Sequence, residues 1–224
     1  MTTPVRTFLL LSLLSAFQLT TATTTLVNKK VDRTIDLTSQ LVVESARLLL
    51  ENTGTDVADQ FLLQVLPEHG PNVAHVSASV AGQQVWLDVQ PTEQADRYIV
   101  HLGNEHAVKP NGQSDLITVQ IVYTKLQHPY PEEILQGDRQ LVNLTGNHYF
   151  YSPYLTKSQQ TKVKFPTSGS IESFSKLKTT TQQDRAIAYG PFEQVAPLSR
   201  SELSVHFENN ANFLVGELIM TSHR

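Results

Sequence analysis

The strongest constraint on the fold is an alternation of apolar and polar residues along most of the chain, because successive side chains of a β-strand point to opposite faces. The clearest segment is 116–126 (LITVQIVYTKL), where Ile117, Val119 and Ile121 share one face. β-Branched residues of this kind favour strands. Since the other face of this segment is also largely apolar, we expect it to be a central strand of a sheet.

Shorter alternating segments lie on both sides of this strand. Residues 76–80, 85–89 and 98–102 are separated by turn-forming residues and predict an antiparallel meander. Later strands are expected at 141–145, 162–165, 203–207 and 213–220. The predicted fold class is therefore mainly β: an antiparallel β-sandwich-like domain with a few short helices.

One segment supports two interpretations. Leu37, Leu41 and Leu48 fit the apolar stripe of a helix, which would run over residues 39–52 and end near Gly54. The same region also alternates with a period of two residues. We favour strands here and keep the helix as the alternative.

The N-terminus has the order of a secretory signal peptide. Arg6 precedes the apolar run 8–17, and Thr20 and Ala22 occupy the −3 and −1 positions of a possible cleavage site. We expect residues 1–22 to be removed, residues 23–212 to form a first lumenal β-rich domain, and residues 213–224 to open a second one. The chain has 224 residues and no Cys, so this domain must fold on its apolar core without disulfides. No later segment approaches the apolar length of a transmembrane helix.

Searches for catalytic motifs are negative, and we predict no catalytic, cofactor-binding or metal site. His101 and His106 could flank a loop metal site with Glu105, but no third ligand is in reach and polar hairpin residues are the better interpretation. Glu132 and Glu133 could supply one carboxylate of a glycosidase pair, yet a solvated loop or a first helical turn is favoured. The net charge of −4 argues against a nucleic-acid partner.

Asn143 begins the only N-x-S/T sequon of the chain and is a glycosylation candidate in a lumenal protein. It lies inside a predicted strand, so burial would oppose modification.

The most unusual stretch is 146–154 (GNHYFYSPY), which concentrates four aromatic rings before and after a turn. Such rings can form a core strand or a binding surface. Alternation would place Tyr149 and Tyr151 on one face and Phe150 on the other, so we expect Phe150 in the core and the tyrosines at the rim. The structural or contact residues proposed from this motif are His148, Tyr149, Phe150, Tyr151, Pro153 and Tyr154.

Together with other motifs, this stretch resembles the ribophorin I family. The further motifs are LVN at 26–28, RTIDL at 33–37, HPYP at 128–131, YGPF at 189–192 and VHFENN at 205–210. The resemblance implies a non-catalytic subunit of the oligosaccharyltransferase complex in the endoplasmic reticulum lumen. That complex transfers a dolichol-linked oligosaccharide to Asn of nascent N-x-S/T proteins, and its catalytic carboxylates and metal belong to another subunit.

The resemblance also implies partners: the other oligosaccharyltransferase subunits and nascent polypeptide, with no cofactor. Family members are longer, with a second lumenal β domain, a transmembrane helix and a cytosolic tail. Two alternatives remain. A glycosidase-like hydrolase would show a carboxylate pair about 5–10 Å apart in a cleft, and a free chaperone-like lumenal binder would not co-purify with glycosyltransferase subunits.

Overall fold

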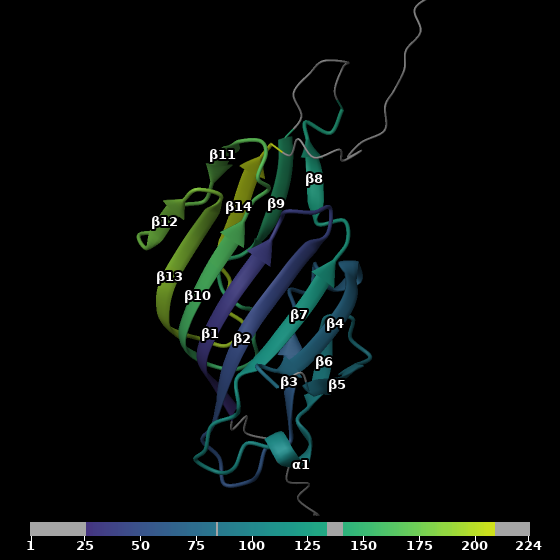
Figure 1. The fold of residues 1–224 in the computed structure, drawn as a ribbon, viewed down its shortest axis with the longest axis vertical. Helices are drawn as coiled ribbons and strands as arrows, with labels where there is room; N and C mark the ends of the chain where they lie inside the picture. The colour runs from purple at the N-terminus through teal and green to yellow at the C-terminus, as the bar shows by residue number, and fades with distance from the viewer. Residues whose placement is uncertain (1–25, 84, 134–140, 209–224) are drawn as a thin grey trace, which may run out of the picture.

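The computed structural model describes residues 26–83, 85–133 and 141–208, whose regular secondary structure is almost entirely β-strand (Figure 1). The helical elements of this part are short: the 3₁₀ turn Gly70–Asn72 and α1 (Gly103–His106). The strands are β1 (Leu26–Asp36), β2 (Val42–Asn52), β3 (Gln60–Gln64), β4 (Val73–Val80), β5 (Val85–Pro91), β6 (Arg97–His101), β7 (Ile117–Tyr123), β8 (Gln127–Tyr130), β9 (Leu141–Asn147), β10 (Thr156–Lys164), β11 (Ile171–Phe174), β12 (Thr180–Gln183), β13 (Ala186–Val195) and β14 (Glu202–Phe207).

These strands make two sheets, as predicted. The larger has ten strands in the order β12-β13-β10-β1-β2-β7-β4-β5-β6-β3, and the smaller has four in the order β11-β14-β9-β8. Neighbouring strands are antiparallel except β1 and β10, which run parallel. This parallel pair has no local sequence signal, because it joins segments separated by more than 100 residues.

The predicted central strand is confirmed as β7, which lies between β2 and β4 inside the ten-stranded sheet. The ambiguous region forms β2, so the strand interpretation is correct and the helix alternative is wrong. The even-numbered side chains from Val42 to Asn52 are buried, while the odd-numbered ones between them are half-buried or exposed. Only a period of two residues produces this pattern.

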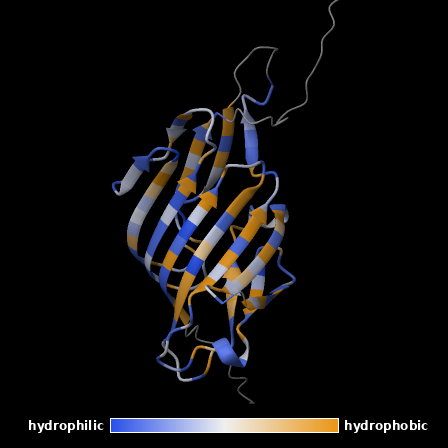
Figure 2. Ribbon diagram, in the orientation of Figure 1, coloured by the Kyte–Doolittle hydropathy of each residue, from blue (hydrophilic) through white to orange (hydrophobic). Residues whose placement is uncertain are grey.

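The two sheets share one apolar core. Val142, Leu144 and Val205 of the small sheet belong to the same buried cluster as Val163 and Ile187 of the large one. Figure 2 shows the alternating hydrophobic and hydrophilic bands along the strands that this burial requires. In the part of the chain described, no helix is long and apolar enough to cross a membrane. The predicted signal peptide and the predicted strand 213–220 lie outside the described residues.

Candidate functional site at the aromatic connection

Most of the aromatic motif forms a connection, residues 148–155, that leads the chain from β9 of the small sheet to β10 of the large sheet. Its start is fixed to the segment before β14. The Asn147 amide donates to the carbonyl of Ser199 (2.9 Å) and accepts from the N–H of Ser201 (2.7 Å). The N–H of His148 donates to the carbonyl of Ser201 (2.8 Å). Two segments about 50 residues apart are therefore held side by side.

A buried ion pair of the large sheet also holds this connection in place. Arg33 of β1 and Glu44 of β2 are 6% and 8% exposed, and the guanidinium donates to both carboxylate oxygens, at 2.8 and 3.0 Å. Its remaining Nη1 donates to the backbone carbonyls of Asn147 (2.6 Å) and Tyr149 (3.1 Å). Arg33 therefore joins two strands of the large sheet to the aromatic connection, and the geometry satisfies both charges.

Sequence reasoning missed this ion pair, although a signal was present. Arg33 occupies an inward position between the buried Val31 and Ile35, and Glu44 lies between the buried Val42 and Ala46. A charged residue at an inward position of an alternating strand must find a partner inside the protein. Two such positions in adjacent strands predict a pair.

Further contacts fix the rest of the connection. The Asn28 amide of β1, which is fully buried, donates to the hydroxyls of Ser152 (2.9 Å) and Thr156 (3.0 Å). From β10, Gln159 accepts the N–H of Phe150 (3.1 Å) and Thr161 donates to the carbonyl of His148 (2.8 Å). Because the connection lies outside any sheet, side chains replace the hydrogen bonds that a strand partner would supply.

The His148 imidazole is 1% exposed and sits among polar partners. Its Nε2 is 3.0 Å from the Ser175 hydroxyl, its Nδ1 is 3.0 Å from the Ser201 hydroxyl, and its ring meets the edge of Tyr189 at 4.6 Å between centroids. Burial lowers the pKa of His148, against the opposing hydrogen bond to Ser201, so the neutral ring is favoured. Burial also raises the pKa of Tyr189 to about 12. The distance between the Ser175 hydroxyl and His148 Nε2 is typical of a nucleophile and its base. The imidazole is buried, however, so a substrate cannot reach it.

The expectation for the aromatic rings is confirmed for Phe150, which is buried in the core, and is wrong for Tyr151. Tyr151 is 9% exposed and lies in the interior rather than at the rim, and Tyr154 is 7% exposed. The Tyr154 hydroxyl accepts the N–H of Leu62 on the edge strand β3 (2.8 Å), and Arg200 lies over the Tyr151 ring at 5.5 Å. The alternation rule failed for Tyr151 because this residue is not in a strand.

Tyr149 is the aromatic residue of the connection that remains half-exposed. Its ring meets Phe192 edge to face, with centroids 5.0 Å apart. The two rings border a surface hollow of about 490 Å³ that Pro191, Gln194 and Ser199 also line. A partly exposed aromatic pair beside a hollow offers contact area at low conformational cost. Pro153, the remaining residue of the motif, lies half-buried in the bend before Tyr154.

The glycosylation candidate Asn143 lies in the middle of β9, on the outer face of the small sheet. Its cross-strand neighbours are His128 of β8 and His206 of β14. The side chain is half-buried, and among the residues that the structure describes its Oδ1 has no hydrogen-bond partner. Thr145, which completes the sequon, is exposed on the same face.

The other sequence candidates lie apart from this connection. His101 ends β6, whereas His106 ends α1 and pairs with Asp115 (2.9 Å). Within the described ranges, no group of three or more His, Asp or Glu side chains is arranged to hold a metal ion. Glu132 and Glu133 are exposed in the bend after β8.

Comparison with known proteins identifies the family. The sequence matches ribophorin I over residues 26–221. The chain belongs to the ribophorin I family. It is 31% identical over 222 residues to dolichyl-diphosphooligosaccharide–protein glycosyltransferase subunit 1A of Arabidopsis thaliana, covering 95% of this chain and 36% of that protein. Subunit 1B of the same plant is 34% identical over 200 residues, covering 83% of this chain and 42% of that protein. The chain thus spans about two fifths of the length of these relatives.

Among solved structures, a two-domain M1 zinc metallopeptidase aligns with 83% of this chain and 43% of its own, at 12% identity and a TM-score of 0.48.

The structure explains why the ribophorin I motifs occur together. Asn28 and Arg33 of the first two motifs bond to the aromatic connection, and Tyr189 and Phe192 of the YGPF motif pack on His148 and Tyr149. Tyr130 of the HPYP motif meets His206 of the last motif edge to face, at 5.4 Å. Motifs scattered along the sequence therefore form two contact groups in space, one towards each end of β9.

Proposed function

We propose that this ribophorin I family chain is a non-catalytic lumenal subunit of the oligosaccharyltransferase complex. It supports the transfer of dolichol-linked oligosaccharide to Asn of nascent N-x-S/T proteins through protein contacts. Membership of the family carries this proposal, since the related plant proteins are named as subunits of that glycosyltransferase. The partners would be the other subunits of the complex and nascent polypeptide.

The hollow beside Tyr149 is the contact surface that fits this role best. The polar groups of the aromatic connection are used by Arg33, Asn28 and Gln159 inside the protein. Tyr149 and Phe192 instead present partly exposed rings next to the hollow. A rigid, internally bonded support with an aromatic pair on its surface is typical of a protein-binding site.

We also propose a compartment and domain boundaries for the chain. Residues 1–22 would direct the chain to the endoplasmic reticulum and be removed near Ala22. Residues 23–212 would form one lumenal domain, and residues 213–224 would begin another. N-terminal sequencing of the lumenal protein tests the first statement, because a protein that still begins at Met1 contradicts it.

Affinity capture of the tagged full chain from microsomes tests the proposed function. We expect other oligosaccharyltransferase subunits in the captured material, and no transfer of labelled oligosaccharide to an acceptor peptide by the purified chain alone. Capture without any of those subunits would favour a free lumenal binder. Transfer by the purified chain would show that the subunit is catalytic.

A further inference from the structure

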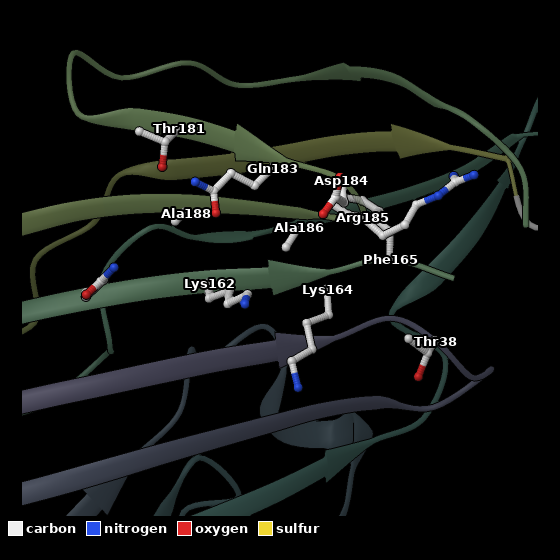
Figure 3. Close-up of a pocket in the computed structure, with 11 residues that line it drawn as sticks. Thr38, Lys162, Lys164, Phe165, Thr181, Gln183, Asp184, Arg185, Ala186 and Ala188 are labelled. Carbon is white, nitrogen blue, oxygen red and sulfur yellow. The ribbon is translucent and has the colours of Figure 1, made fainter. Parts of the chain in front are cut away.

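A trough of about 610 Å³ runs over β13 on the outer face of the ten-stranded sheet. Its floor is formed by Ala186 and Ala188, whose short side chains leave space between the longer ones of the adjacent strands β10 and β12. Figure 3 shows these alanines between the lysines of β10 and the side chains of Thr181 and Gln183 on β12. The width of the trough is therefore set by two strand spacings, about 10 Å.

One wall of the trough carries two positive charges. Lys162 and Lys164 are exposed on β10 and are separated by the buried Val163, so they project from the same face. Asp36 lies beside Lys164 in the pairing of β1 with β10, but its carboxylate accepts from the N–H and hydroxyl of Thr38. In the described part of the chain, neither lysine has an ion-pair partner.

The end of the trough at the β12–β13 turn adds little negative charge. Asp184 lines it, but Arg185 does so as well and donates to the carbonyl of Gly169. In Figure 3 the Arg185 side chain extends away from the two lysines. The charged residues that line the trough thus sum to a positive value in a chain whose net charge is −4.

We infer that this trough binds an acidic, extended polypeptide segment. Lys162 and Lys164 are two positions apart on a strand, about 7 Å, which is also the repeat of side chains on one face of an extended chain. Carboxylates at alternate positions of a bound segment would face both lysines. The amide of Gln183 and the hydroxyl of Thr181 can exchange hydrogen bonds with its backbone. This inference does not depend on assembly into the oligosaccharyltransferase complex.

A peptide titration with the purified full chain tests it. The probe is a fluorescein-labelled peptide of four Glu-Ser repeats, compared with four Gln-Ser repeats, by fluorescence anisotropy at low salt. We expect the acidic peptide to bind at least tenfold more tightly than the neutral one. Lys162→Glu with Lys164→Glu should weaken it at least tenfold. The control, Lys109→Glu with Lys125→Glu, makes the same change in net charge at two exposed lysines outside the trough and should leave affinity unchanged.

A second variant distinguishes binding in the trough from a general attraction between opposite charges. Ala188→Gln fills the floor without altering charge and should also weaken the acidic peptide, in a protein with an unchanged far-UV circular dichroism spectrum. Equal affinity for the two peptides would overturn the inference. Equal losses in the two lysine variants would do the same, and so would binding of inorganic phosphate in place of the peptide. Capture of the other glycosyltransferase subunits is independent of all these outcomes.

Discussion

Replacing Arg33 with Met should destabilise the protein strongly, because it leaves the Glu44 carboxylate buried without its partner. Removing one member of a buried ion pair costs about 3–5 kcal/mol. The carbonyls of Asn147 and Tyr149 also lose a donor, and each buried carbonyl left unpaired adds about 1–3 kcal/mol. For a domain of this size each kcal/mol lowers Tm by about 2–4 °C. We therefore expect Arg33→Met to lower Tm by roughly 10 °C or more.

The outer face of the same two strands supplies a matched control. Arg47 of β2 lies 3.8 Å from Asp32 of β1, and its side chain is 60% exposed. An exposed pair of this kind contributes at most about 1 kcal/mol, so Arg47→Met should leave Tm nearly unchanged. Thermal unfolding at pH 7 measures the Tm of both variants. Equal effects of Arg33→Met and Arg47→Met would refute the argument that burial gives the inner pair its importance.

A double variant separates the ion pair from the two carbonyl bonds. Combining Arg33→Met with Glu44→Leu removes both charges, and replacing a buried pair by apolar residues is often neutral or stabilising. We expect the double variant to recover part of the stability lost in Arg33→Met, with the cost of the unpaired carbonyls remaining. A double variant less stable than Arg33→Met would contradict this division.

Three further predictions concern the aromatic connection and the sequon. Phe150→Ala should lower the free energy of unfolding by about 3–5 kcal/mol, whereas Tyr149→Ala, which removes a half-exposed ring, should cost much less; urea titration compares them. Since the pKa of His148 is lowered from 6.5 in the folded state, unfolding takes up a proton in acid, and stability falls as the pH drops below about 6.5. His148→Gln should flatten this fall, as read from Tm between pH 7.5 and 5.5. Because Asn143 is only half-buried and Thr145 is exposed on the same outer face, the lumenal protein should carry a glycan at Asn143, seen as a mobility shift lost after glycosidase treatment and in Asn143→Gln.

Much of the fold could be predicted from the sequence because period-two alternation is a local signal. The strand 116–126 follows directly from the alternation of Ile117, Val119 and Ile121. The meander before it follows from the same alternation within residues 76–80, 85–89 and 98–102. The parallel pairing of β1 with β10 and the strands β11 to β13 were not foreseen. Those strands are short or interrupted, with polar residues or a Gly-Pro step in place of clean alternation.

The aromatic connection shows the limit of predicting burial from local alternation. Alternation placed Phe150 correctly in the interior but misplaced Tyr151, since the backbone there is held by side chains of distant strands rather than by hydrogen bonds to a neighbouring strand. Those partners, Gln159 and Asn28, could not be assigned from spacing alone. That this motif contacts other proteins stays a prediction.

The most direct test of the proposed protein contacts is photo-crosslinking from the position of Tyr149. A photoreactive phenylalanine analogue replaces Tyr149, and in a parallel sample it replaces Gln120, an exposed residue on the outer face of β7. In intact microsomes we predict a covalent adduct between position 149 and another oligosaccharyltransferase subunit, and none from position 120. Folded protein that gives no adduct with any subunit from position 149, or the same adduct from both positions, would contradict the account.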